Sequence, residues 1–215
     1  MSAARRAVLA IFFFSVCAHA QTRTLAVYSG PGQRIESAAM HALQTELQRV
    51  LTPADIRVSW VQSVTDKTQT PEFQLAVVGT FDGDCSIENL PDQPARTIPA
   101  LKLAESSVSN GRVFPFFRVD CSHIIQTLSP DLRSLSVPMR ENVLGRALAR
   151  AIAHEIYHIL AQTTGHENSG IAKASLSRAD LYSAKFNFTP ESLLRMQAPP
   201  SRKPSRDVVA VLTNR

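Results

Sequence analysis

Five consecutive residues, His154-Glu155-Ile156-Tyr157-His158, carry the side chains in this sequence that are best suited to chemistry. Residues four apart on a helix lie one turn apart on the same face, so both imidazoles can reach one metal ion. Glu155 is rotated by about 100° from His154, and its carboxylate can reach a metal-bound water without entering the metal shell. Metal-assisted hydrolysis requires neutral nitrogen ligands, an open position for water and a base that takes the proton of that water.

The residues around this motif are uncharged, which favours a metal site over a polar patch on the surface. Residues 151–153 and 159–161 carry no charge, and neither do Ile156 and Tyr157, the two residues between Glu155 and His158. Two imidazoles and a carboxylate buried there without partners would cost several kcal/mol, and a metal ion is an efficient partner. We therefore expect zinc at His154 and His158, with Glu155 as the catalytic base.

A third metal ligand is expected in the turn that follows the helix. Thr163 and Thr164 continue a helix poorly, and Gly165 can end it in the left-handed conformation, so the chain can fold back toward the metal. His166 comes next and is our preferred third ligand. A histidine on a surface loop is the alternative interpretation of this residue.

Two residues further along the chain could support the site. Asp180 could accept a hydrogen bond from a ligand histidine, or it could be an acidic charge at a helix N-terminus. Tyr182 could donate a hydrogen bond to an oxyanion in the transition state, or it could serve in packing. Their positions relative to the histidines decide between these roles.

Short apolar patterns predict the elements that position these residues. Strands are expected at residues 24–28, 56–60 and 73–81, and an amphipathic helix at 33–51. The apolar run in the third strand predicts that it is central and covered on both faces. Asn110-Gly111 between two β-prone runs predicts a hairpin of strands 100–107 and 112–120. A short helical stretch should follow and end at Pro130.

The longest predicted helix, residues 140–162, carries the histidine motif. Pro138 opens it, and its interior has no proline and is rich in Ala, Leu, Arg and Glu. Apolar residues recur along it as a broad stripe, so the helix should be central. A last helix is expected to begin at Thr189-Pro190, an N-cap followed by a proline in the first turn.

The motif and the order of these elements resemble the HExxH zinc metallopeptidases, the zincins, and among them the metzincins most nearly. The resemblance covers residues 24–175 in outline. It implies an α+β fold with a twisted mixed sheet of about five strands, an N-terminal crossover helix and a long active-site helix. Only His154, Glu155 and His158 match the metzincin motif residue for residue.

After the second histidine the sequence departs from the metzincin pattern. The positions of the motif's glycine and third histidine hold Ala161 and Thr164, and His166 follows two residues later. The stretch that would form the methionine-containing turn beneath the metal has no methionine. Other zincins use a downstream glutamate or aspartate as third ligand, so the resemblance keeps Glu191 and Asp180 as alternatives to His166.

Residues 1–20 predict export of the chain. Arg5 and Arg6 precede an apolar run that ends at Cys17, and a small-x-small pattern ends at Ala20, where signal peptidase should cleave. The run is shorter than the about 20 residues that span a bilayer, so we expect no permanent membrane span. A lipoprotein anchor on Cys17 would need a small residue just before the cysteine, and Val16 is not small. Arg5 and Arg6 leave twin-arginine export as an alternative. The mature protein should be secreted or periplasmic.

The mature chain is predicted to be one domain, residues 21–200, followed by a flexible basic tail, residues 201–215. It has 21 basic and 18 acidic residues, which is a mild surplus. Nucleic-acid binders usually show a basic stripe with interleaved aromatic residues, and the only dense basic stretch is in the tail, so we expect no nucleic-acid partner. Cys85 and Cys121, the pair left after cleavage, predict a disulfide.

These features predict a small exported zinc peptidase that acts as a monomer on a peptide or protein substrate. The strand at residues 100–107 could bind an extended substrate by strand addition. Two alternatives remain: an exported binding or envelope protein that keeps the scaffold without hydrolysis, and a metal-free domain in which the motif is accidental. The intact Glu155 favours the enzyme.

Overall fold

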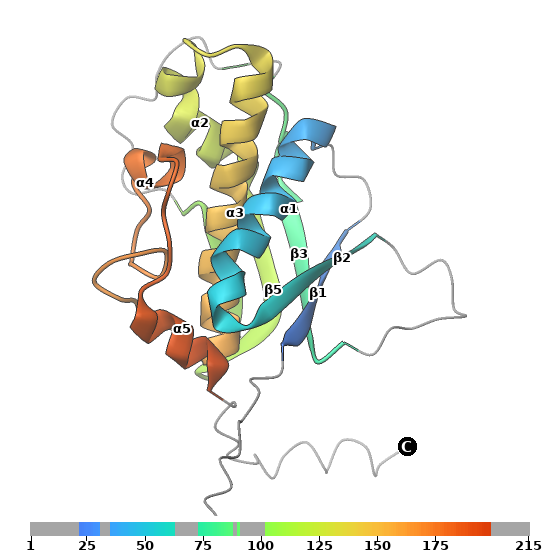
Figure 1. The fold of residues 1–215 in the computed structure, drawn as a ribbon, viewed down its shortest axis with the longest axis vertical. Coiled ribbons are helices and arrows are strands. Elements are labelled where there is room, and N and C mark those ends of the chain that lie inside the picture. The colour runs from blue at the N-terminus through green and yellow to red at the C-terminus, as the bar shows by residue number, and fades with distance from the viewer. Residues whose placement is uncertain (1–21, 31–34, 63–72, 88–89, 91–101, 199–215) are drawn as a thin grey trace, which may run out of the picture.

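A five-stranded mixed sheet forms the centre of the protein (Figure 1). The computed structural model describes residues 22–30, 35–62, 73–87, 90 and 102–198. The strand order is β2-β1-β3-β5-β4, with β4 antiparallel to β5 at one edge and the other pairs parallel. The strands are β1 (Arg23–Ser29), β2 (Ile56–Gln62), β3 (Leu75–Asp82), β4 (Ala104–Ser109) and β5 (Arg112–Asp120). The predicted α+β fold with a mixed sheet is confirmed.

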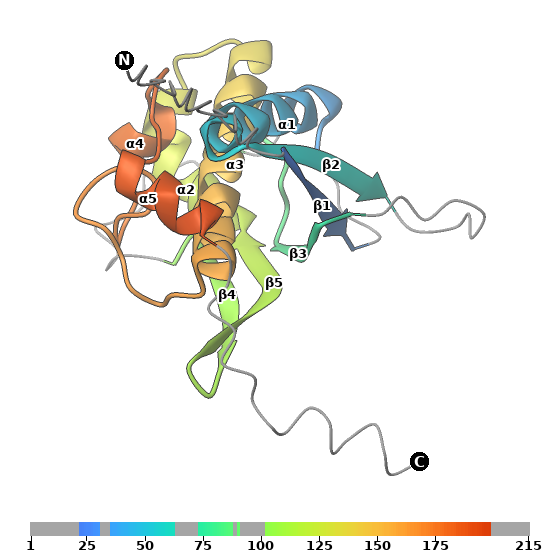
Figure 2. The same cartoon turned by 60° about the horizontal axis from the view of Figure 1, so that its bottom comes forward.

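Two long helices cover one face of this sheet (Figures 1 and 2). α1 (Ser37–Leu51) follows β1, and α3 (Val137–Ala161) packs beside α1 and against β4 and β5. Burial alternates along β3 as a result, because Val77 is 1 % exposed whereas Val78 is 37 % exposed. β3 is central as predicted, but the prediction that both of its faces are covered is wrong.

The contact between α1 and α3 is unusually close at a glycine. Gly145 of α3 lies so near α1 that a Cβ at this position would collide with the carbonyl oxygen of Ala39 and with the Ala42 side chain. Small residues on both helices thus let the two backbones approach each other. This contact fixes the helix that carries the histidine motif.

The end of α3 is set by a glutamine and not by a glycine. Gln162 has a positive φ of 49°, and its side-chain amide donates to the carbonyl oxygens of Ile159 (2.7 Å) and Val113 (3.0 Å). These hydrogen bonds offset the cost of a left-handed backbone at a residue other than glycine. Gly165 follows three residues later without a positive φ, so its predicted role as helix terminator is wrong.

The first helix and the hairpin follow the prediction with shifted boundaries. α1 begins at Ser37 and not at residue 33, because the backbone of Ile35 pairs with Cys85. Asn110 and Gly111 form the two-residue hairpin loop with φ of 50° and 72°, as their sequence predicts. The first hairpin strand, β4, begins four residues later than expected and ends two residues later. Residues 100 and 101 lie outside the described part of the chain.

α2 (Cys121–Leu132) is anchored at its start by a disulfide and continues through a proline. Cys121 is bonded to Cys85 in the loop after β3, with the Cα atoms 5.0 Å apart, and this predicted pair is confirmed. The predicted break at Pro130 is wrong. The Ser129 hydroxyl donates to the carbonyl oxygen of Gln126 at 3.1 Å, which compensates for the N–H that the proline lacks.

The remaining elements are short. They are η1 (Thr52–Ala54), α4 (Arg178–Tyr182) and α5 (Pro190–Gln197). α5 begins as predicted, because the Thr189 hydroxyl accepts from the backbone of Ser192 at 3.2 Å. α4 was not expected. The predicted signal peptide and basic tail lie outside the described residues, and no helix within the described part is long and apolar enough to cross a membrane.

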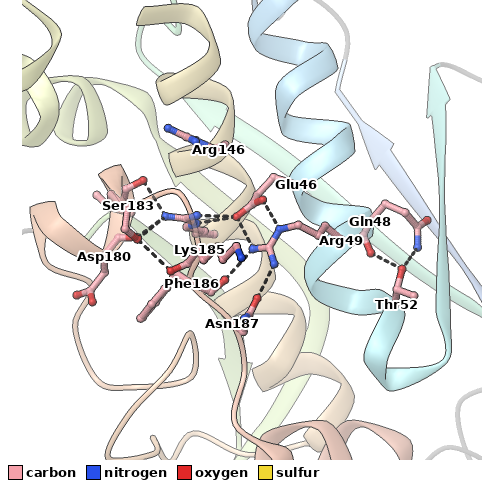
Figure 3. Close-up of polar contacts among 12 residues, drawn as sticks. Glu46, Gln48, Arg49, Thr52, Arg146, Asp180, Ser183, Lys185, Phe186 and Asn187 are labelled. Carbon is pink, nitrogen blue, oxygen red and sulfur yellow. Dashed lines mark hydrogen bonds and ion pairs between the residues drawn. The ribbon is translucent and has the colours of Figure 1, made fainter. Parts of the chain in front are cut away.

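A buried clasp ties the chain after α3 to both long helices (Figure 3). Arg150, one turn before His154 on α3, is 0 % exposed, and its guanidinium lies 2.8 Å from the carboxylate of Glu46 on α1. It also donates to the carbonyl oxygens of Asp180 at 2.5 Å and Leu181 at 3.1 Å. The segment that includes α4 is therefore held against the middle of α3, one turn before the histidine motif.

The contribution of Glu46 to the stability of the fold should be lost in acid. Burial alone would raise the pKa of this carboxyl, but the hydrogen bonds and charges of Arg49 and Arg150 outweigh burial and lower the pKa. A carboxyl with a lowered folded-state pKa stabilises the protein above its unfolded pKa, and this contribution is lost as the pH falls through the folded pKa. Glu46→Gln should therefore cost about 3 kcal/mol at neutral pH, and much less in acid.

Urea unfolding of both proteins from neutral pH downward would measure this difference. Glu105→Gln is the control, because Glu105 pairs with Arg118 on an exposed surface where solvent screens the charges. Its effect at neutral pH should be smaller. A loss in Glu46→Gln that keeps the same size at every pH would contradict the assignment of Glu46 as the charged centre of the clasp.

Candidate metal centre

Three histidines meet at the C-terminal end of α3. His154 and His158 come from the helix, and His166 comes from the loop that follows it. One ring nitrogen of each lies within 4.8 Å of the others, and the Nε2 atoms of the two helix histidines are 3.0 Å apart. The structure thus brings together the three residues that the sequence proposes as metal ligands.

Backbone carbonyls orient both helix histidines. Nδ1 of His154 lies 2.7 Å from the carbonyl oxygen of Ile171, and Nδ1 of His158 lies 2.7 Å from that of Thr163. A carbonyl can only accept, so Nδ1 of each ring carries the proton and Nε2 of each neutral ring keeps its lone pair. Two lone pairs 3.0 Å apart repel each other unless a cation lies between them. The arrangement fits a metal ion.

Burial keeps the two helix histidines in the neutral form that binds metal. Burial lowers the pKa of His154, and the hydrogen bond to the Ile171 carbonyl opposes this effect. Burial also lowers the pKa of His158, with a further contribution from the neighbouring His154. Imidazoles are suitable ligands for zinc, copper, iron and nickel, so the three rings could hold a metal ion.

Glu155 extends from the same helix toward the edge strand β4. Its residue is 5 % exposed, and its Oε2 accepts a hydrogen bond of 2.5 Å from the Ser106 hydroxyl. Burial raises the pKa of Glu155, and the hydrogen bond from Ser106 opposes the rise. No sequence pattern indicates Ser106, because it is 49 residues from Glu155 and lies in a strand that contains other serines.

The histidines and Glu155 line a cleft of about 730 Å³. Its walls come from β4, from α2 and α3, and from residues 174–178, which lead into α4. Sites that hold small molecules have volumes of about 300–1,000 Å³. The cleft is therefore large enough to hold part of a peptide next to the three imidazoles.

A hydrogen-bonded loop returns His166 to the helix histidines. The next residue, Glu167, donates its backbone N–H to the carbonyl oxygen of Ala172 at 2.9 Å. Its carboxylate accepts from the Tyr157 hydroxyl at 2.9 Å and pairs with Arg195 of α5 at 3.3 Å. Tyr157 lies between the two helix histidines in the sequence and is fully buried. Its hydrogen bond to Glu167 connects the motif helix directly to the loop.

Tyr157→Phe should weaken the binding of a metal ion, tested with zinc, about 10-fold, because groups that support metal ligands are worth about 10- to 100-fold in affinity. The fold should stay intact. The substitution removes only the hydroxyl that holds Glu167, so the loop with His166 is less ordered before the metal binds. Competition with a zinc indicator would measure Kd. Tyr182→Phe is the matched control, because Tyr182 does not line the cleft. Equal losses in the two variants would contradict the prediction.

The other candidate residues lie apart from the three histidines. Asp180 is in the first turn of α4, where its carboxylate completes a capping box with Ser177 and pairs with Lys173 at 2.6 Å. Tyr182 is at the end of α4, and Glu191 is in the first turn of α5. In the described part of the chain, the group of three or more potential ligands whose atoms lie within 4.8 Å of one another consists of the three histidines. The structure does not bring Asp180 or Glu191 into this group.

This geometry can support hydrolysis assisted by a metal ion. It places nitrogen donors and a buried carboxylate along one cleft. The carboxylate of Glu155 is not in the group of potential ligand atoms, which leaves it available as a base. No protein-family model matches the chain and no curated protein is detectably similar to it, so this interpretation rests on the residues themselves.

Proposed function

We propose that this chain is an exported zinc-dependent peptidase with a zincin-like fold, in which His154, His158 and His166 hold the metal. The observation that carries the proposal is the placement of the three imidazoles and the Glu155 carboxylate along one cleft beside β4. Zinc is favoured because paired helix histidines with an adjacent glutamate are typical of zinc hydrolases. The disulfide agrees with an oxidising compartment.

In the proposed reaction an extended peptide binds along β4, the edge strand of the sheet. A bound zinc ion would polarise the scissile carbonyl and lower the pKa of water to about 7. Glu155 takes the proton of the attacking water on its carboxylate and passes it to the amine nitrogen that leaves.

The test uses the protein purified after export, with its zinc content and its activity on a peptide library measured by mass spectrometry. We expect about one zinc per chain, and peptide cleavage that a chelator abolishes and added zinc restores. A folded protein that binds no zinc would contradict the metal site. A protein that holds zinc but cleaves no peptide would contradict the peptidase and favour an exported binding protein.

A further inference from the structure

The edge strand β4 directs one hydroxyl toward the histidine motif. Ser106 lies opposite Phe117 in the ladder with β5, and the pairing register shifts directly after it, before Val108. Oγ of Ser106 is 2.5 Å from Oε2 of Glu155 and 3.4 Å from the carbonyl oxygen of the same residue. The side chain and the backbone of Glu155 thus both lie next to this one residue of the strand.

The geometry of β4 explains why this serine, among its neighbours, reaches the helix. Side chains alternate along a strand, and Glu105 points to the other face, where it pairs with Arg118 of β5. The pairing register with β5 shifts between Ser106 and Val108, and irregularities of this kind are common near functional sites. Ser106 also lines the cleft that contains the histidines.

A buried glutamate needs a partner that fixes its carboxylate. Glu155 is almost fully buried, and its side chain has three torsions that could take the carboxylate out of reach of the substrate. Of the two carboxylate oxygens, the Ser106 hydroxyl donates to Oε2, so Oε1 stays available for a proton. A serine in a strand of the sheet is a rigid anchor for this purpose.

We propose that Ser106 is the positioning residue of the general base, because its hydroxyl holds the Glu155 carboxylate in the cleft. This inference rests on the proposed peptidase function. Ser106 is not among the potential metal ligands, and in this proposal it acts on the reaction through Glu155. Its removal should therefore change the rate of the chemical step and leave substrate binding and metal binding as they are.

Ser106→Ala should lower kcat about 10- to 100-fold with an unchanged KM and an unchanged zinc content, because misplacement of a catalytic group by about 1 Å can cost as much. Ser59→Ala is the matched control: Ser59 is also a half-buried strand residue, but it lies in β2, at the opposite edge of the sheet, and does not line the cleft. An unchanged kcat, or a raised KM with kcat unchanged, would overturn the proposal. The second result would assign Ser106 to substrate binding.

A double-mutant cycle separates failure of this inference from failure of the proposed function. Urea midpoints of wild type, Ser106→Ala, Glu155→Ala and the double variant are measured in chelator, so that no activity is needed. If the hydrogen bond holds the carboxylate, the two single shifts should not add. Additive shifts would overturn the positioning role even in an active enzyme, whereas non-additive shifts in a protein without peptidase activity would reject the peptidase alone.

Discussion

Glu155→Gln should lower kcat/KM for peptide hydrolysis about 1,000-fold, the size of effect expected when a group that moves protons is lost. Glutamine has the same shape, and its amide oxygen can still accept the hydrogen bond from Ser106. It cannot take a proton from water. Since Glu155 is not one of the three potential metal ligands, the variant should retain its zinc.

The same peptide assay and zinc analysis check this result. Glu141→Gln is the matched control, because Glu141 lies in the first turns of the same helix, far along the chain from the motif, and does not line the cleft. Cleavage by Glu155→Gln within about 10-fold of wild type, still sensitive to chelator, would show that another group is the base. Loss of zinc from the variant would instead make Glu155 a metal ligand.

The elements that the sequence predicts best are those with a local signal at each end. Asn110-Gly111 indicates the hairpin because both residues tolerate positive φ. Thr189 and Pro190 indicate the start of the last helix for an equally local reason. The unexpected α4 also has such a signal, since Ser177 lies three residues before Asp180 as in a capping box.

The parts of the site that the sequence cannot predict depend on contacts between distant residues. Ser106 meets Glu155 only because of the register and irregular pairing of β4 with β5. The carbonyl groups of Ile171 and Thr163 orient the helix histidines, but every residue has a carbonyl, so no residue type marks this role. The motif therefore predicts the chemistry of the centre, and the fold supplies the groups that orient it.

An experiment on the third metal ligand can decide between the spacing of the metzincin motif and the position of His166 in the structure. His166 stands two residues beyond the position of the third histidine in the metzincin motif. The left-handed Gln162 at the end of α3 and the hydrogen bonds of Glu167 accommodate the longer loop. As a result the His166 ring lies 4.8 Å from the His158 ring and 5.2 Å from the His154 ring, measured between centroids.

His166→Ala should weaken zinc binding by more than about 100-fold, because loss of a ligand must exceed the 10- to 100-fold effect of groups that only support ligands. His166 is exposed, so the substitution opens no cavity and unfolding in chelator should be unchanged. Glu191→Gln and Asp180→Asn are the informative controls, since each removes an alternative third ligand. Zinc competition titrations would rank the three variants. A large loss of affinity in either carboxylate variant, with His166→Ala near wild type, would show that the loop moves aside when zinc binds and that the centre is completed from α4 or α5.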